Sequence, residues 1–182
     1  METGDSKVTR LAYAIVLVLA SAWVAGVFIA PLVDATSTLA GFLHLAYSKV
    51  CHQITDRSFH IAGQPLAVCS RCSGVYAGYL AGLFIYPLVR SLFRTDTPPR
   101  IWLLVALVPV AVDFLGGYAG IFENTSVSRA LTGSIAGVAG AFYTLPGLVS
   151  MAASAWTRRK HFGTNKQGGT KWSKNPANCS PR

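Results

Sequence analysis

Charged residues are scarce in this sequence of 182 residues: 13% are Asp, Glu, Lys or Arg, and seven are acidic. Ordinary soluble domains carry about 25% charged residues, so this composition argues against a soluble domain. Hydrophobic residues make up 52%, and the mean hydropathy is +0.42. They also come in runs of about 20, the length that crosses a hydrocarbon core of about 30 Å. The sequence therefore predicts an integral membrane protein.

The common catalytic motifs are also missing. The sequence has no phosphate-binding glycine loop, no HExxH pair of zinc-binding histidines and no GxSxG nucleophile elbow. The sequence therefore gives no support for a nucleotide-binding P-loop enzyme, an HExxH metalloprotease or a GxSxG serine hydrolase. Motifs alone do not decide whether the protein is an enzyme.

Basic residues are concentrated at the C-terminus. Residues 157–182 contain seven Lys or Arg and no acid, and subtracting these seven from the net charge of +9 leaves +2 for the rest. No stacking-aromatic pattern or readout motif accompanies this charge, so we expect no nucleic-acid partner. Because the segment is rich in Gly, Ser, Asn and Lys, we expect a disordered cytoplasmic tail that contacts anionic lipid headgroups.

Four apolar stretches are long enough to cross a bilayer. Their approximate bounds are residues 11–33, 66–89, 101–120 and 130–156. The first exceeds the core of a signal peptide, so we interpret it as an uncleaved helix. Residues 37–50 are too short to span, and their apolar positions recur at helical spacing, which predicts an amphipathic helix at the interface. The predicted fold is an all-α membrane bundle over residues 1–156, with a Cys/His loop at 34–71.

Lys and Arg cluster ahead of the first predicted span, between the second and third, and in the tail. The clusters are Lys7 with Arg10, then Arg90, Arg94 and Arg100, then residues 157–182. Cytoplasmic loops of membrane proteins carry the excess of Lys and Arg. We therefore expect a multi-pass protein of the cell (plasma) membrane with both termini cytoplasmic. Loops 34–71 and 120–129 would then lie outside.

Glycine recurs at every fourth position in two predicted spans. The residues are Gly74, Gly78 and Gly82 in the second span and Gly133 and Gly137 in the fourth. Lipid tails offer no hydrophobic drive for helix association, so close backbone approach at glycine supplies the packing energy. The pattern predicts that the second span packs against the fourth.

Three of the four cysteines share a short segment with two histidines. This set is Cys51, His52, His60, Cys69 and Cys72. The CxxC pair puts two thiols on one side of a turn, and Cys51 with either histidine would complete a Cys3His shell, the chemistry of a structural zinc site. We therefore predict a zinc or similar site that serves binding or transport of an unspecified substrate.

Two other interpretations of these cysteines stay open. A CxxC at the start of a helix with Arg71 between the thiols favours thiolate, as in thiol–disulfide exchange. The layout resembles membrane thiol oxidoreductases of four helices that pass electrons to quinone, with Cys51 as the partner thiol. Such enzymes usually employ a second cysteine pair, whereas Cys179 lies in the predicted cytoplasmic tail. The remaining interpretation is a plain structural disulfide.

One acidic residue, Asp113, lies inside a predicted span. A carboxylate in hydrocarbon costs about 2.5 to 3.5 kcal/mol, so we expect it to pair with Arg129 or Arg71. The pair would either clamp two helices or belong to a pocket for an anion or a lipid headgroup. In that pocket Arg57, Arg71 and Arg129 would bind the ligand and Asp113 would gate it. A transporter of this kind would require homo-oligomers, because four spans are few for a monomer.

The segment from Cys51 to Gly78 resembles the signature of a known family. The matching residues are Cys51-His52, Arg57-Ser58-Phe59 and Cys69-x-Arg71-Cys72-x-Gly74-x-Tyr76-x-Gly78. They are similar to a family of predicted prokaryotic membrane proteins catalogued as a domain of unknown function. A second block resembles it at Asp113, Asn124, Arg129, Thr132 and Gly133, although Phe114 stands where the family has glycine. The resemblance implies a prokaryotic membrane protein and no particular reaction.

Overall fold

The computed structural model describes residues 3–33, 37–94 and 96–167. Its helices are α1 (Thr3–Ile29), α2 (Thr38–Ser48), α3 (Ser70–Val89), α4 (Arg100–Tyr118) and α5 (Ser126–Gln167). The other elements are the 3-10 helices η1 (Ala30–Leu32) and η2 (Thr55–Arg57) and the antiparallel strands β1 (His60–Ile61) and β2 (Gln64–Pro65). Cys179 and the rest of the predicted tail beyond Gln167 lie outside the described residues.

Four of these helices are long and apolar enough to cross a membrane. The candidate spans are Ser6–Leu32, Ser70–Val89, Arg100–Tyr118 and Ser126–Arg158. The short helix α2 occupies the segment predicted to be amphipathic. The predicted all-α bundle of four membrane helices is therefore confirmed.

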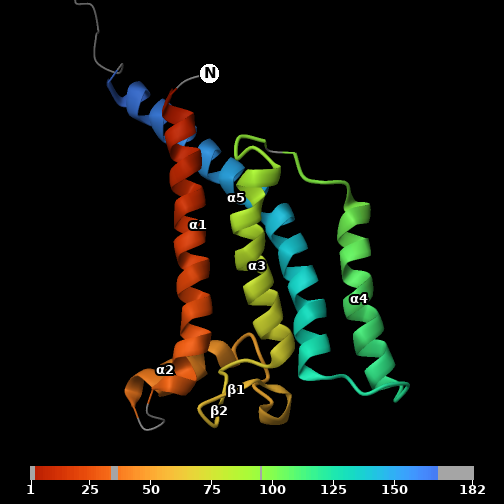
Figure 1. Cartoon of the computed structure of the whole chain (residues 1–182). Helices are drawn as coiled ribbons and strands as arrows, with labels where there is room; N and C mark the ends of the chain where they lie inside the picture. Colours follow the sequence, from red (N-terminus) through yellow and green to blue (C-terminus); the bar gives the residue numbers. More distant parts are fainter. Residues whose placement is uncertain (1–2, 34–36, 95, 168–182) are drawn as a thin grey trace, which may run out of the picture.

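The connections between the long helices gather at the two ends of the bundle (Figure 1). One end carries α2, the small sheet and the loop between α4 and α5, and we call it the cysteine end because the segment from Cys51 to Cys72 lies there. The start of α1, the loop between α3 and α4 and the last turns of α5 lie at the opposite end.

Three helices differ from their predicted bounds, and the first, α1, begins at Thr3, not near residue 11. α3 begins at Ser70, not near residue 66, because Gln64 and Pro65 first complete the β-hairpin. α5 begins at Ser126, since the Thr125 hydroxyl accepts the Ser128 amide at 3.0 Å and caps the helix. It then continues to Gln167, so residues 157–167, expected in a disordered tail, extend the helix. No proline interrupts that stretch, and basic residues near a helix C-terminus are favourable.

α3 and α5 pack at backbone distance through glycine. A Cβ at any of five glycines would come within 3 Å of an atom of the other helix. The contacts are Gly74 with Ala130, Gly78 with Ser134, Gly82 with Ala141, Gly133 with Arg71 and Gly137 with Val75. Four of these contacts are to backbone carbonyls, which cannot move aside as a side chain can. The approach therefore requires glycine.

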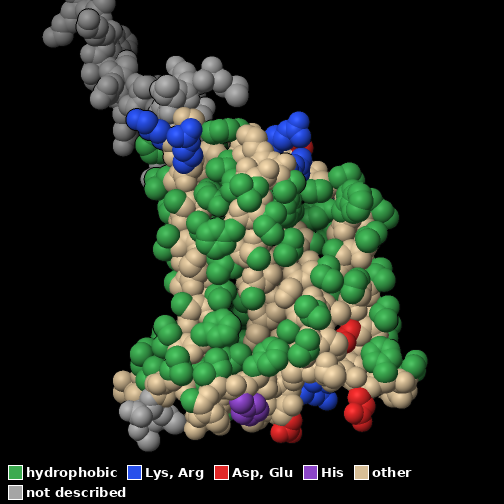
Figure 2. All heavy atoms as spheres, viewed as in Figure 1, with side chains coloured by type: hydrophobic (Ala, Val, Ile, Leu, Met, Phe, Trp, Pro, Cys, Tyr) green, Lys and Arg blue, Asp and Glu red, His purple; other side chains and the backbone are tan. Residues whose placement is uncertain are grey.

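α4 is the most exposed of the four spans. It packs against α5, where the Tyr143 hydroxyl donates to the Pro99 carbonyl at 2.7 Å and accepts the Leu103 amide at 3.1 Å. Its other faces expose large apolar side chains such as Trp102. Hydrophobic side chains cover the flanks of the bundle, and charged side chains gather at its ends (Figure 2). Lipid would cover these flanks, as expected for a membrane protein.

Two buried clusters stabilise the bundle. One lies at the cysteine end and contains Val27, Ala30, Tyr47, Cys51, Leu66, Ala67 and Val68. The other joins α3 to α5 through Leu83, Tyr86, Ala141, Leu145 and Val149. In the first cluster, the Tyr47 hydroxyl donates to the Trp23 carbonyl at 2.6 Å and ties α2 to α1. The cysteine segment is thereby held against two spans.

Candidate functional site

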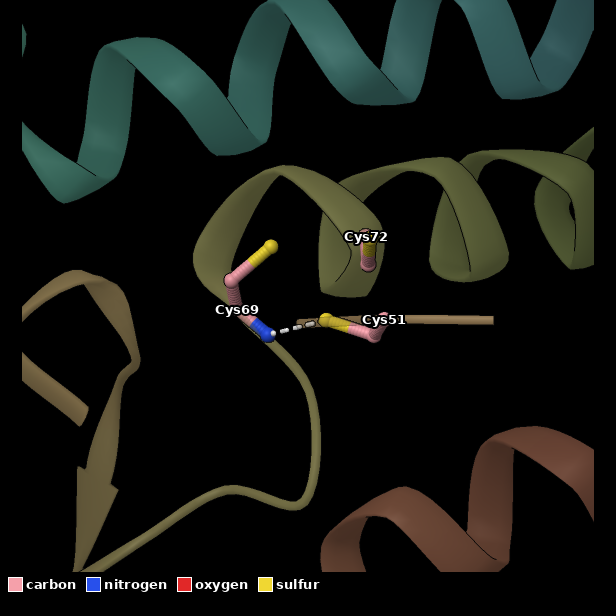
Figure 3. Close-up of side chains that lie close together, drawn as sticks. All are labelled: Cys51, Cys69 and Cys72. Atoms are coloured by element: carbon pink, nitrogen blue, oxygen red, sulfur yellow. Dashed lines mark hydrogen bonds between the residues drawn. The ribbon is translucent and has the colours of Figure 1, made fainter. Parts of the chain in front are cut away.

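The three cysteines of the loop meet at the start of α3 (Figure 3). Cys51 follows α2 and is buried, Cys69 is the N-cap of α3 and Cys72 lies in its first turn. Their sulfur atoms lie within 4.8 Å of one another, and all three are free thiols. In a tetrahedral zinc–thiolate shell the sulfurs are about 3.8 Å apart, given Zn–S bonds of about 2.3 Å. After small side-chain movements, the three sulfurs could therefore hold one metal ion.

The Cys51 sulfur accepts two backbone hydrogen bonds. The donors are the amides of Cys69, at 3.2 Å, and of Gln53, at 3.5 Å. Gln53 has a φ of 51°, in the left-handed region that non-glycine residues rarely adopt. Its turn brings the Gln53 amide back toward Cys51. Hydrogen bonds from neighbours orient and tune metal-binding side chains, so this geometry suits a thiolate ligand.

Gln53 also connects the two segments that carry the cysteines. Its side-chain amide donates to the carbonyls of His44 in α2 and of Ala67 before α3, both at 2.9 Å. Sequence reasoning missed this residue, because a glutamine in a polar loop has no distinguishing pattern. Only the fold shows that its amide lies between His44 and Ala67.

The pKa of the Cys69 thiol, at the N-cap of α3, is lowered mainly by its neighbour Cys72. The hydrogen bond from the Cys72 thiol lowers the pKa of Cys69 to about 5, and the backbone amides of Cys72 and Arg71 act in the same direction. Burial opposes this shift. This shift favours the thiolate form of Cys69, the form that binds metals and attacks disulfides.

The two predicted histidine ligands lie outside this group. Among the described residues, the cluster of potential metal ligands that includes Cys51 contains only the three cysteines. His52 and His60 are both exposed, and His60 is on β1, paired with Pro65. The hairpin returns the chain to α3 and so brings Cys69 and Cys72 to Cys51, whereas His60 lies exposed on the first strand of that hairpin.

Asp113 is buried where α3, α4 and α5 meet. Its carboxylate forms an ion pair with Arg71 of α3 and accepts the Ser128 hydroxyl of α5 at 2.9 Å. Its backbone carbonyl accepts the side-chain amide of Asn124. Of the two expected partners, the structure pairs Asp113 with Arg71 and leaves Arg129 apart. Sequence reasoning did not anticipate either the Ser128 or the Asn124 contact.

A cavity of about 730 Å³ opens beside this ion pair, and we call it the arginine pocket. Its lining comprises Arg57, Arg71, Phe114, Gly117, Tyr118, Gly120, Ile121, Phe122, Glu123, Asn124 and Arg129. All three arginines of the predicted pocket line it. Asp113 does not line it, but it contacts two lining residues, Arg71 through its carboxylate and Asn124 through its backbone carbonyl.

Comparison with known proteins places the chain in a family. Residues 51–143 match the family described as "Predicted membrane protein (DUF2085)". Uncharacterized protein MJ1492 of Methanocaldococcus jannaschii is 38% identical over 141 residues, which cover 74% of this chain and 90% of that protein. An uncharacterized protein of Methanothermobacter thermautotrophicus is 30% identical over 94 residues, or 52% of this chain and 83% of its own. No solved structure matches the chain.

The predicted resemblance to a family of uncharacterised membrane proteins is therefore confirmed. The matched region begins at Cys51 and includes Arg129, so it contains both the thiol cluster and the arginine pocket. On this match and the archaeal relatives, the chain belongs to the DUF2085 family of predicted membrane proteins.

Proposed function

We propose that this membrane protein binds one thiophilic metal ion, with zinc as the first candidate, through Cys51, Cys69 and Cys72. The observation that carries the proposal is the approach of the three sulfurs to within 4.8 Å. Thiolates select zinc, copper(I) and iron–sulfur centres over hard cations such as magnesium. The acidity of Cys69 and the two amide hydrogen bonds to Cys51 favour the thiolate form that such an ion requires.

The number of thiols bears on the role of the metal. Structural zinc sites use four protein ligands, whereas sites that exchange a ligand keep one position open. Three thiols leave the fourth position to His52 or His60 of the same loop, or to an exchangeable ligand. The second arrangement favours a binding or transport role, in which the ion or its fourth ligand is delivered at this site.

We further propose that the cysteine end faces away from the cytoplasm. Arg90, Arg94 and Arg100 flank the loop between α3 and α4, at the same end as the start of α1. Figure 2 shows more Lys and Arg side chains at that end, whereas the other end carries His, Asp and Glu side chains and a smaller group of Lys or Arg. The positive-inside rule then favours cytoplasmic termini and an outward-facing metal site.

Metal and thiol analysis of the full chain, purified anaerobically in detergent, tests the metal proposal. We expect about one zinc per chain in wild type, loss of the metal in Cys69→Ser, and full retention in the control Cys179→Ser. His52→Ala and His60→Ala then identify the fourth ligand, if a histidine supplies it. A wild-type protein that neither carries metal nor takes up added zinc, copper(I) or iron(II) would overturn the proposal.

A thiol–disulfide oxidoreductase is the second candidate, and the contact between Cys69 and Cys72 favours it. Cys69 and Cys72 would form a disulfide, and their two electrons and two protons would pass to a quinone, which becomes the quinol. Cys51 would be the partner thiol. Loss of two free thiols on incubation with a soluble quinone, blocked in Cys72→Ser, would support this function over metal binding.

A further inference from the structure

We propose that the arginine pocket binds a singly charged phosphate group, supplied either by a lipid headgroup or by a soluble phosphate. The inference does not depend on metal binding, because none of the residues that line the cavity is a proposed metal ligand. Arg71 lines the cavity and also lies in the sequence between Cys69 and Cys72. The charges that line the cavity indicate the charge of the ligand, and the size and apolar wall of the cavity indicate its source.

The pocket holds positive charge that the protein does not neutralise. Among the described residues, neither Arg57 nor Arg129 forms an ion pair, although both line the cavity. Arg71 is neutralised by Asp113, and Glu123 also lines the cavity. Counting Glu123 against Arg57 and Arg129 leaves one positive charge, which matches a phosphodiester or a phosphate monoanion.

The backbone adds to this charge. Arg129 lies in the first turn of α5, and Asn124 of the lining lies just before that helix begins. The N-terminus of a helix carries partial positive charge that favours an anion, and here the amides of Ser128 and Arg129 already bond to Thr125. Arginine guanidinium groups bind phosphate oxygens in pairs, so Arg57 and Arg129 supply the matching fork geometry.

The ion pair with Asp113 makes Arg71 a fixed wall of the pocket. Its guanidinium is also 5.8 Å from the centre of the Phe114 ring, a cation–π contact. Arg71 is therefore held by α4 on two sides, whereas Arg57 is exposed on η2 and Arg129 is half-buried. The two unpaired arginines are the ones free to close on a ligand.

The other wall of the pocket is apolar and exposed. Phe114, Tyr118, Ile121 and Phe122 line it, and each is between 45% and 86% exposed. Aromatic side chains at the end of a membrane helix lie at headgroup level. A cavity of about 730 Å³ is also far larger than a phosphate ion alone needs. These features favour the lipid headgroup over the soluble source.

Lipid retention by the full chain tests the inference, measured by native mass spectrometry after delipidation and addition of defined lipids. The arms are phosphatidylglycerol, zwitterionic phosphatidylcholine, and inorganic phosphate or glycerol phosphate as competitors. We expect Arg57→Gln and Arg129→Gln each to weaken phosphatidylglycerol binding by about tenfold or more, because each removes a charge-assisted hydrogen bond. Arg129→Lys should restore part of the loss, and Arg94→Gln at the opposite end is the matched control.

The possible results distinguish a lipid headgroup from a soluble phosphate as the ligand, and both from a pocket that binds neither. Phosphatidylglycerol binding that depends on Arg57 and Arg129 supports the lipid headgroup. Arginine-dependent binding of phosphate or glycerol phosphate without lipid binding supports the soluble source. If the Arg57→Gln/Arg129→Gln double variant binds all these probes as wild type does, or wild type binds none, the inference is overturned. Metal content measured on the same samples keeps this failure distinct from failure of the metal proposal.

Discussion

Arg71 and Asp113 form an ion pair that joins α3 to α4. Arg71 stands between two cysteines of the thiol cluster and also lines the arginine pocket. The same carboxylate accepts the Ser128 hydroxyl of α5, so three helices meet at Asp113. The two candidate sites therefore share one charged residue.

Replacing Asp113 by Asn should destabilise the bundle by about 1 to 3 kcal/mol, because the partly exposed Arg71 loses its buried counter-charge. Arg71→Gln in the same chain should recover part of this loss. Thermal unfolding of the single and double variants in detergent measures the coupling. If the stability losses of the two single variants simply add in the double variant, Asp113 and Arg71 have no pairing energy. Glu123→Gln is the control, because it removes an exposed carboxylate.

Removing the metal should lower the melting temperature and open the cysteine end. Metal binding is coupled to folding of the segments that supply the ligands. Chelator should therefore speed protease cleavage between α2 and α3, and Cys69→Ser should reproduce this without chelator. Cleavage that is equally slow with and without chelator would mean that no metal stabilises the loop.

Gln53→Ala should destabilise the cysteine end by about 1 to 3 kcal/mol, because the carbonyls of the half-buried His44 and the buried Ala67 each lose a donor. It should also speed metal release to chelator, since Cys51 and Cys69 are then held less firmly. Stopped-flow chelation measures this rate. Gln64→Ala, which changes an exposed glutamine on β2, is the matched control, and equal rates for both variants would exclude a positioning role for Gln53.

Gly137→Ala should cost about 1 to 3 kcal/mol, because its methyl group would meet the Val75 carbonyl of α3. Gly147→Ala on the same helix should be neutral or stabilising, because nothing lies within 4 Å of its added Cβ and alanine favours helix. The melting temperatures of the two variants decide the matter. Equal values would show that α3 and α5 are not in close backbone contact.

The proposed orientation predicts opposite labelling of cysteines introduced at the two ends. Asp56→Cys at the cysteine end should react with an impermeant thiol reagent in intact cells, above the wild-type background. Thr97→Cys, between α3 and α4, should react only after permeabilisation. Both positions are exposed, so accessibility within the protein does not separate them. The reverse result would indicate the inverted orientation.

The four spans were predictable because crossing hydrocarbon imposes a length and a composition on each helix. The limits of α3 and α5 were less predictable. Ser70 begins α3 only because a hairpin precedes it, and Ser126 begins α5 through the Thr125 cap. Such details depend on a few hydrogen bonds, which a hydropathy pattern does not report.

The amino-acid sequence by itself determined the membrane class, the spacing of glycines along two helices and the CxxC pair, because these are local patterns. Only the tertiary structure decided which distant residues meet. It brought Cys51 to the CxxC and left His52 and His60 exposed, and it chose Arg71 over Arg129 as the partner of Asp113. The physical reason is that these contacts depend on how the helices and the hairpin pack, and packing is a property of the whole chain.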